Sequence, residues 1–254
     1  MRISVQSTAA LCSILAVAVP GCGGEGESTV PPSPAPAATT TAATTASSTT
    51  QPPSTDAPTT TTTAAQAAPA PPLFGQTGAL AAGTYLVDKF GTPLHVTVPA
   101  GWTTFGDFAL MSPEGFEAGY LGFWDVDDVN LDACHWNGRA NVGPSVDELV
   151  AGLVGQLGMD VTAPTAIEVD GRAGQAVTLS PADVDPATCD EGTVSPWFEA
   201  DGDSRFYAAP GETETVWIVD LDGHRAVLNA GSVVDVAPAT RAQLDDMLAS
   251  IRIG

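Results

Sequence analysis

The chain has 254 residues and a formal net charge of −22 at pH 7, from 30 acidic and 8 basic residues. A surface of this sign repels the phosphates of nucleic acids and anionic lipid headgroups, so nucleic-acid binding is excluded as a function class. Composition divides the chain into an apolar start, a Thr/Ala/Pro-rich tract that ends at residue 73, and a mixed remainder. The remainder, residues 74–254, is about the length of one globular domain, and its acidic surface favours a monomer.

An apolar run near the N-terminus extends from about Ala9 to Val19. About a dozen such residues are too few to span a bilayer as a helix, but they fit the apolar region of a signal peptide. The run ends in Val19-Pro20-Gly21-Cys22, which resembles the lipobox of bacterial lipoproteins, where an acylated Cys follows Gly or Ala. The resemblance implies that residues 1–21 are removed and that Cys22 becomes the lipid-modified N-terminus.

Ordinary secretion is the alternative, because Ala16-Val17-Ala18 also fits a signal-peptidase cleavage site. Of the four cysteines, Cys12 lies inside the signal peptide, while Cys134 and Cys189 can pair within the globular part. Secretion would leave Cys22 as a free thiol in an oxidising compartment. We therefore expect an extracytoplasmic protein that is anchored to the cell membrane through Cys22.

Residues 22–73 contain almost no large apolar side chains and are rich in Thr, Ala, Pro and Ser. Such a tract cannot bury enough surface to offset the entropy of ordering, so we predict a disordered tether with a polyproline-II bias. The same composition is typical of mucin-like stalks that carry O-linked sugars, and a plain spacer is the alternative. In either case the tract would hold the domain away from the membrane.

Alternating apolar residues predict antiparallel strands in the globular part. Residues 94–98 (LHVTV) place Leu, Val and Val on one face, and a second strand is expected within residues 118–126. The pairs Asp170-Gly171 and Asp222-Gly223 each lie between alternating segments. Since Asp-Gly supplies the positive φ angles of a type I′ turn, both pairs predict β-hairpins.

Two amphipathic helices are expected, from Ser145 to Leu157 and from Pro238 to Ser250. Ser145 with Glu148 would form a capping box on the first helix, and Thr240 with Gln243 would do so on the second. The apolar stripe of the first helix comprises Val146, Leu149, Val150, Leu153, Val154 and Leu157, and that of the second comprises Leu244, Met247, Leu248 and Ile251. One stripe on each helix predicts that each covers one face of a sheet.

The order of strands, helix, two hairpins and helix predicts an α+β fold, with an antiparallel sheet flanked by the two helices. The segments TPLHVTVPAGW, VWIVDLDG and LASIRI resemble the PsbP-like αβα sandwich. Together, GFWDVDDVNLDACHW, GPSVDELVAGL, VDGRAGQAVTLSP and CDEG are similar to a group of uncharacterised actinobacterial lipoproteins and secreted domains. The resemblance covers most of residues 80–254 and implies this fold and an exported protein. Relatives of the broader fold act as non-enzymatic binding or assembly factors.

The densest group of potential metal ligands is the segment from Asp125 to Trp136, DVDDVNLDACHW. Counted from Asp128 as an EF-hand, the segment has Ala133 where the loop needs Gly and Arg139 where it needs a bidentate Glu. A zinc site would need three or four His or Cys ligands, but the chain has three isolated histidines. We expect no metal and no cofactor, and we interpret the aspartates as an acidic, solvent-facing loop; a calcium site of another kind is the alternative.

Cys134 and Cys189 are predicted to form a disulfide, because the domain is exported and their number is even once the two N-terminal cysteines are set aside. In the chain-entropy model this cross-link stabilises the fold by up to about 4 kcal/mol. Trp136 and Trp197 lie near these cysteines in the sequence and are predicted to pack against the disulfide, and Trp217 is predicted to be in the core.

No motif identifies a reaction, since the chain has neither G-x-S-x-G nor H-E-x-x-H. His224 with Asp220 or Asp222 could join a distant Ser in a triad, but turn residues at a hairpin tip are the preferred interpretation. We predict no catalytic residues and a binding module for a cell-envelope protein or a small ligand. The alternatives are a cell-wall or extracellular hydrolase and a structural or antigenic surface protein. An apolar pocket with convergent polar groups would favour binding, and paired carboxylates in a cleft would favour hydrolysis.

Overall fold

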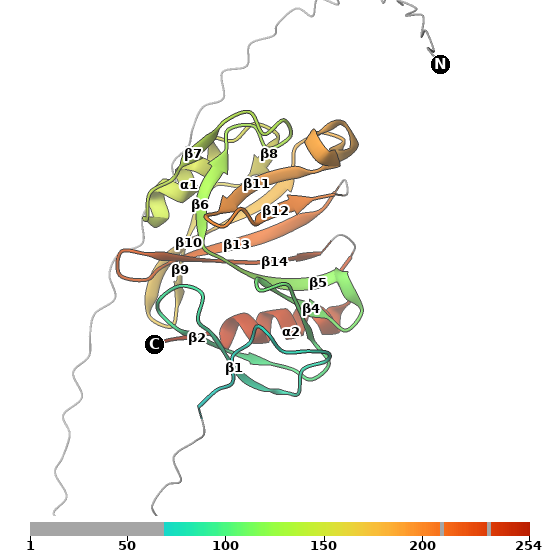
Figure 1. Ribbon diagram of the computed structural model, residues 1–254, viewed down its shortest axis with the longest axis vertical. Helices are drawn as coiled ribbons and strands as arrows, with labels where there is room; N and C mark the ends of the chain where they lie inside the picture. Colours follow the sequence, from blue (N-terminus) through green and yellow to red (C-terminus); the bar gives the residue numbers. More distant parts are fainter. Residues whose placement is uncertain (1–68, 209–210, 233–234) are drawn as a thin grey trace, which may run out of the picture. The chain divides into compact units, whose positions relative to one another are not determined.

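The computed structural model describes residues 69–208, 211–232 and 235–254 (Figure 1). The predicted signal peptide, Cys22 and the predicted tether up to residue 68 lie outside the described residues. Pro71 and Leu73 already exchange backbone hydrogen bonds with Leu86, and Leu73 is fully buried, so both belong to the folded part. In the described part of the chain, no helix has the length and hydropathy needed to cross a membrane.

The described residues form two helices, two short 3₁₀ helices and fifteen strands. The strands are β1 (Gly83–Val87), β2 (Leu94–Val98), β3 (Thr103–Phe105), β4 (Ala109–Ser112), β5 (Gly115–Trp124), β6 (Val126–Asn130), β7 (Arg139–Asn141), β8 (Met159–Val161), β9 (Thr165–Val169), β10 (Arg172–Pro181), β11 (Val194–Glu199), β12 (Ser204–Tyr207), β13 (Thr213–Asp220), β14 (Arg225–Ser232) and β15 (Arg252–Ile253). The helices are α1 (Val146–Val154), α2 (Pro238–Ala249), η1 (Pro186–Thr188) and η2 (Asp190–Gly192).

The strands build three antiparallel sheets. The central sheet has eight strands in the order β3-β4-β5-β14-β13-β10-β8, and β9 also pairs with β10. A three-stranded sheet has the order β1-β2-β15, and a four-stranded sheet has the order β12-β11-β6-β7. Only Asp125 separates β5 from β6, so the chain passes there from the central sheet directly into the four-stranded sheet.

The central sheet is covered on both faces, by α1 on one face and by α2 on the other (Figure 1). Val216 and Ile218 of β13 face α1 and the four-stranded sheet, whereas Trp217 and Val219 face α2 and the three-stranded sheet. The predicted α+β class is therefore confirmed, and the two helices lie on opposite faces of the central sheet. The predicted single flanked sheet was too simple, because two small sheets share the covering with the helices.

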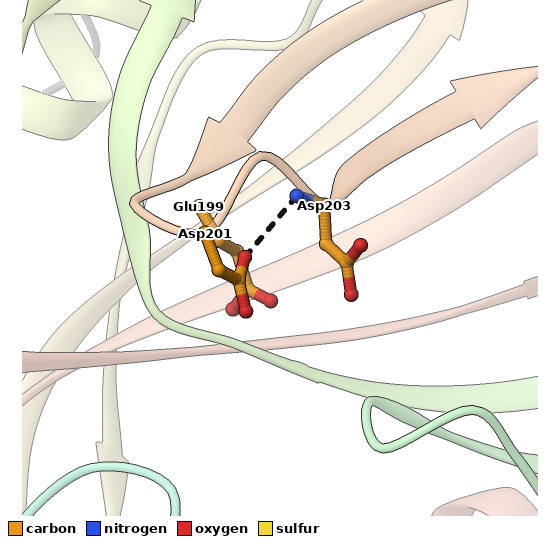
Figure 2. A group of neighbouring side chains, drawn as sticks. All are labelled: Glu199, Asp201 and Asp203. Carbon is orange, nitrogen blue, oxygen red and sulfur yellow. Dashed lines mark hydrogen bonds between the residues drawn. The ribbon is translucent and has the colours of Figure 1, made fainter.

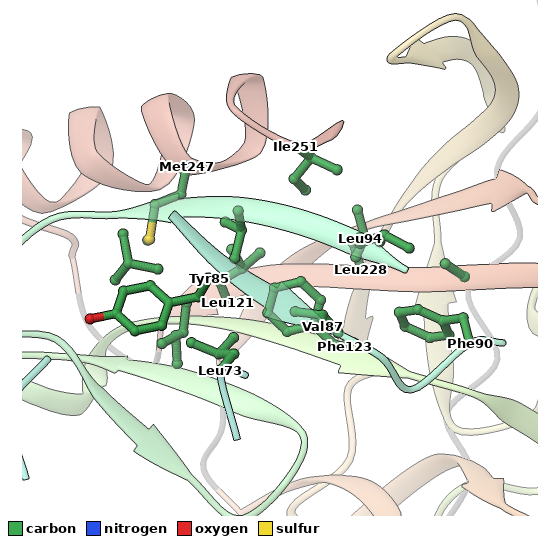
Figure 3. Close-up of a cluster of buried hydrophobic side chains, with 14 of the residues drawn as sticks. Leu73, Tyr85, Val87, Phe90, Leu94, Leu121, Phe123, Leu228, Met247 and Ile251 are labelled. Atoms are coloured by element: carbon green, nitrogen blue, oxygen red, sulfur yellow. The ribbon is translucent and has the colours of Figure 1, made fainter. Parts of the chain in front are cut away.

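The core on the α2 side draws on segments far apart in the sequence (Figure 3). Leu94 of the predicted strand is buried there with Leu121 and Phe123 of β5, and Met247 and Ile251 enter from the C-terminal segment. Burying each such side chain stabilises the fold by about 1.5–3 kcal/mol. This side of the domain therefore depends on the last residues of the chain.

Both predicted hairpin turns are confirmed. Asp170 and Gly171 have φ angles of 49° and 78°, and Asp222 and Gly223 have φ angles of 60° and 99°. Two positive φ angles in succession define the type I′ turn, whose twist matches that of the paired strands. The first turn joins β9 to β10, and the second joins β13 to β14.

The predicted start of α1 is confirmed, but its predicted end was wrong. Ser145 Oγ accepts a hydrogen bond from the Glu148 N–H at 3.2 Å, and Glu148 Oε2 accepts one from the Ser145 N–H at 3.1 Å. The helix ends at Val154, and Gly155 forms its C-cap. Leu157 is 66% exposed because the chain has already turned to pair with Asp132.

The predicted capping box of α2 was wrong. The N-cap is Ala237, which has no side-chain cap, and Pro238 begins the helix. Thr240 is instead buried in the first turn, and its Cγ2 lies so close to β5 that a Cβ at Gly119 would be 3.0 Å away. Gln243 accepts a hydrogen bond from Trp102 Nε1 at 2.8 Å. Thr240 and Gln243 therefore contact other parts of the fold instead of capping the helix.

The predicted disulfide between Cys134 and Cys189 is present, with an S–S distance of 2.06 Å. Trp197 is fully buried in the same core as both cysteines. Trp136 is only partly buried, and its ring meets Phe198 edge-on with 5.8 Å between the ring centroids. The disulfide fastens the segment after β6 to the 3₁₀ helices that precede β11.

Candidate functional site

The acidic segment from Asp125 to Trp136 is not a loop throughout, because Val126–Asn130 forms strand β6. Asp132, just after this strand, accepts hydrogen bonds from the N–H groups of Cys134 and His135, both at 3.0 Å. Its carboxylate therefore stabilises the turn that leads to the disulfide. The expectation of a continuous acidic loop was wrong, and the expectation that the segment binds no metal stays a prediction.

A second carboxylate cluster comprises Glu199, Asp201 and Asp203 after β11 (Figure 2). Their closest oxygens lie within 4.8 Å of one another. Lys89 Nζ lies 2.6 Å from Glu199 Oε2, and the Asp125 N–H donates to Glu199 Oε1 at 2.5 Å. Burial raises the pKa of Glu199, although both of these donors oppose that shift.

This carboxylate cluster was not predicted from the sequence. The alternating spacing of Glu199, Asp201 and Asp203 was a visible signal, but Lys89 lies 110 residues away from Glu199. Both oxygens of Glu199, the one buried carboxylate of the cluster, already accept hydrogen bonds within the chain, and Lys89 places a cation beside it. We interpret it as a contact between the β1–β2 connection and the four-stranded sheet.

The second hairpin tip does not form a triad. Asp222 Oδ1 lies 2.6 Å from Arg172 Nη1, on the neighbouring hairpin. His224 carries the carbonyl that accepts a hydrogen bond from the Leu221 N–H at 2.8 Å, which closes the turn. The interpretation of Asp222 and His224 as turn residues is therefore confirmed.

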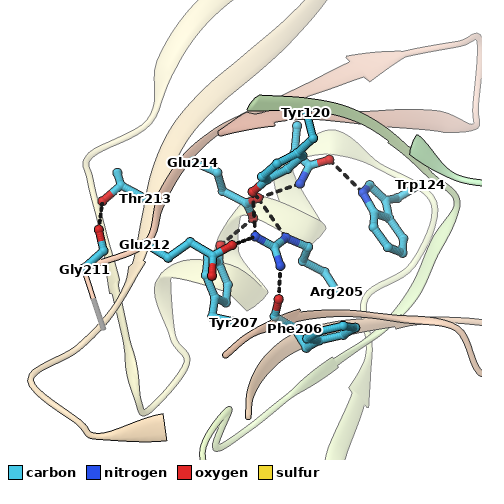
Figure 4. A network of polar contacts seen from close by, with 10 residues as sticks. Tyr120, Trp124, Arg205, Phe206, Tyr207, Gly211, Glu212, Thr213 and Glu214 are labelled. Atoms are coloured by element: carbon cyan, nitrogen blue, oxygen red, sulfur yellow. Dashed lines mark hydrogen bonds and ion pairs between the residues drawn. The ribbon is translucent and has the colours of Figure 1, made fainter. Parts of the chain in front are cut away.

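The largest polar feature of the interior is a buried ionic network between the central sheet and β12 (Figure 4). We define the network by its members: Tyr120, Arg205, Tyr207, Glu212, Glu214 and Asn229. The carboxylate of Glu214 has no exposed side-chain surface and accepts four hydrogen bonds. Tyr120 and Asn229 donate at 2.6 Å, Arg205 Nε donates at 2.9 Å, and the Tyr207 hydroxyl is the fourth donor.

Arg205 is the cation of the network. Its Nη2 donates to Glu212 Oε1 at 2.5 Å and to the Tyr120 hydroxyl at 2.6 Å. Burial alone would lower the pKa of Arg205, but the charge of Glu214 and the other neighbours raise it well above its usual value. Burial also raises the pKa values of Tyr120 and Tyr207, which keeps both hydroxyls neutral as donors. One guanidinium thus joins two buried carboxylates.

Two glycines make room for the network. A Cβ on Gly122 would lie 2.0 Å from Asn229 Oδ1, and a Cβ on Gly231 would lie 2.7 Å from the Tyr120 hydroxyl oxygen. Nothing in the sequence pattern signals these members as partners, because Tyr120 and Glu214 are 94 residues apart. The burial of these side chains and the hydrogen bonds that link them indicate that the network has a structural role.

A groove runs along α2 on the opposite face of the central sheet. We define the α2 groove as two adjoining cavities, of about 400 and 330 Å³, that share Trp217 and Leu248. The first cavity also has Thr215, Arg241 and Asp245 in its walls. The second is mainly apolar and extends to β9 and to the end of α2.

The position of α2 explains the groove. The helix packs on β5 and β2, which leaves the neighbouring part of the central sheet incompletely covered. Trp217 of β13 is consequently only partly buried and packs against the core, whereas the sequence predicted that it lies within the core. Its ring lines both cavities, so the floor of the groove is apolar.

The rim of the α2 groove is acidic. Asp235 and Asp245 border the first cavity, and Glu168 borders the second. Among the described residues that line the groove, Arg241 is the one basic residue. The groove therefore combines an apolar floor with an excess of negative charge, which suits an apolar group carried by a neutral or cationic molecule.

A scan against protein-family models gives no match, and a search of curated proteins gives no significant match.

Proposed function

We propose that the protein is an extracytoplasmic lipoprotein, anchored to the cell membrane through Cys22, whose domain is a non-catalytic binding module. The ligand, a cell-envelope protein or a small molecule, would occupy the α2 groove. The observation that carries this proposal is the pair of adjoining cavities that share Trp217 and Leu248, with polar side chains at the rim. Its cavities have the size typical of ligand sites.

The proposed location has separate support. The apolar N-terminal run and the Val19-Pro20-Gly21-Cys22 motif fit a lipoprotein signal, and disulfides such as Cys134–Cys189 persist in oxidising compartments. The resemblance to PsbP-like domains and to actinobacterial lipoproteins belongs to the same proposal. A central antiparallel sheet with a helix on each face is compatible with it.

The binding proposal can be tested by site-specific photo-crosslinking. We expect a full chain with benzoylphenylalanine in place of Ala249, which lines the second cavity, to crosslink a discrete envelope component in cells. The matched control replaces Ala187, an equally exposed alanine on η1, which does not line the groove. Products would be compared by gel electrophoresis and mass spectrometry. Identical products from both positions, or none from Ala249, would contradict binding in the groove.

The anchor has its own test. Cys22→Ala should move the protein from the membrane fraction to the soluble fraction, because the proposed acylation site is lost. Cys12→Ala, within the proposed signal peptide, is the matched control and should leave the protein in the membrane fraction. Fractionation with immunoblotting measures both variants. If the Cys22→Ala protein stays membrane-bound, the proposed anchor is wrong.

A further inference from the structure

Strand β9 has a free edge beside the α2 groove. Among the strands that the structure describes, it pairs with β10 alone, and the two-residue turn fixes the register, with Val169 opposite Arg172 and Ile167 opposite Gly174. In this register, hydrogen-bonded residue pairs alternate with non-hydrogen-bonded pairs. The main-chain N–H and C=O groups of Ala166 and Glu168, which belong to non-hydrogen-bonded pairs, therefore point away from β10. Among the described residues, no backbone hydrogen bond reaches these groups from across the edge.

The free edge adjoins the apolar cavity of the groove. Ile167 and Val169 form the β9 wall of this cavity, of about 330 Å³, and Leu248 and Ile251 line it from the C-terminal segment. Side chains of a strand added to β9 would alternate between the two faces of the sheet. Every second side chain of such a strand would therefore lie on the face that carries the cavity.

The charge around the free edge of β9 indicates which kind of partner could pair with it. Glu168 lies on the edge strand itself, and Asp245 and Asp235 lie farther along the rim. The basic side chains nearby are Arg241, in the wall of the first cavity, and Arg252, whose Nε lies 3.7 Å from Asp170 Oδ1 just after β9. The whole chain carries a net charge of −22, which opposes pairing with a second copy of itself. A basic partner would instead be attracted, because complementary charge steers association.

We propose that the α2 groove binds an extended peptide segment with an apolar side chain between basic residues, and that this segment joins β9 as an additional strand. The main-chain groups of Ala166 and Glu168 bind the peptide backbone, and the apolar side chain packs beside Ile167 and Val169, at the β9 wall of the cavity. This inference rests on the proposed function and names its ligand. Edge-strand addition of this kind derives affinity from main-chain hydrogen bonds and specificity from the side-chain pocket.

The test uses the purified full chain in detergent and a fluorescein-labelled peptide, Lys-Val-Lys-Phe-Lys-Val-Lys, monitored by fluorescence anisotropy. The control peptide has the same sequence with alternate amides N-methylated, so its charge and apolar content are kept while one backbone edge loses its donors. We expect N-methylation on the pairing edge to weaken binding at least about tenfold, because the lost hydrogen bonds leave acceptors on β9 unpaired.

Two proline variants separate edge pairing from other binding. Ala166→Pro removes a donor that faces away from β10, and proline is tolerated on an edge strand. We expect this variant to bind the peptide at least about tenfold more weakly, while Ala163→Pro, the same change outside β9, binds as the wild type does. Circular dichroism checks that both variants remain folded.

Four results would overturn the inference. Equal affinity of the N-methylated peptides, or of Ala166→Pro, would exclude strand addition, and failure of the unmodified peptide to bind would exclude the ligand class. Self-association of the chain that Ala166→Pro abolishes would identify a second copy as the occupant. In each case, crosslinking from Ala249 reports separately on whether the groove binds a ligand at all.

Discussion

Replacing Arg205 with methionine is expected to lower the free energy of unfolding by about 3–5 kcal/mol. Methionine keeps much of the apolar length of the side chain but removes the charge that joins Glu212 to Glu214. Both carboxylates would remain in an interior where their side chains are 4% and 0% exposed. Removing one partner of a buried ion pair costs this much because the remaining charge loses its compensation.

The loss should depend on pH. Burial raises the pKa of Glu212 above its ordinary value of 4.5, and Arg205 opposes that shift, so the variant raises this pKa further. Between the unfolded and folded pKa values, the folded state binds more protons than the unfolded state does. The contribution of Glu212 to stability is therefore full below about pH 4.5 and falls as pH rises through its folded pKa. We expect Arg205→Met to be less destabilising near pH 4 than near pH 7.

Urea unfolding at both pH values measures this effect. Arg241→Met is the matched control, since Arg241 is exposed, and it should change stability by no more than about 0.5 kcal/mol. A loss below about 1 kcal/mol for Arg205→Met, or the same loss at both pH values, would contradict the interpretation of the network as the source of stability.

Removing the disulfide by changing Cys134 and Cys189 to alanine should lower the free energy of unfolding by up to about 4 kcal/mol. The cross-link closes a sequence separation of 55 residues, which includes α1 and the four strands β7 to β10, and so restricts the unfolded chain. Alanine is preferred to serine because both cysteines are buried and a hydroxyl there would need a partner.

Urea unfolding of the alanine variant should match that of the reduced wild-type chain, because both lack the same cross-link. The native state keeps other ties at this corner, since the Asp190 N–H donates to the Cys134 carbonyl at 2.9 Å and the Ser195 N–H donates to the Ala133 carbonyl at 2.8 Å. We therefore expect a folded but less stable variant. An unchanged unfolding midpoint would show that the cross-link adds no stability.

Some elements could be predicted because their determinants lie within a few residues. The type I′ turns need only Asp-Gly between strands, and the start of α1 needs only Ser145 with Glu148 three residues later. The disulfide could be predicted from the number of cysteines, because only Cys134 and Cys189 remain in the globular part once Cys12 and Cys22 are assigned to the N-terminal segment. The same local reasoning failed at Thr240, because contact with Gly119 on β5 decides that this side chain is buried.

The sequence by itself determined the class of fold, the two helices, both hairpins and the pairing of Cys134 with Cys189. Only the tertiary structure decided that Glu212 and Glu214 are buried, because the four-stranded sheet covers a face that an alternating pattern assigns to solvent. It also decided that α2 packs on β5 and β2, which leaves Trp217 at the floor of a groove. Turns and caps depend on neighbours in the chain, whereas burial and cavities depend on segments that meet only after folding.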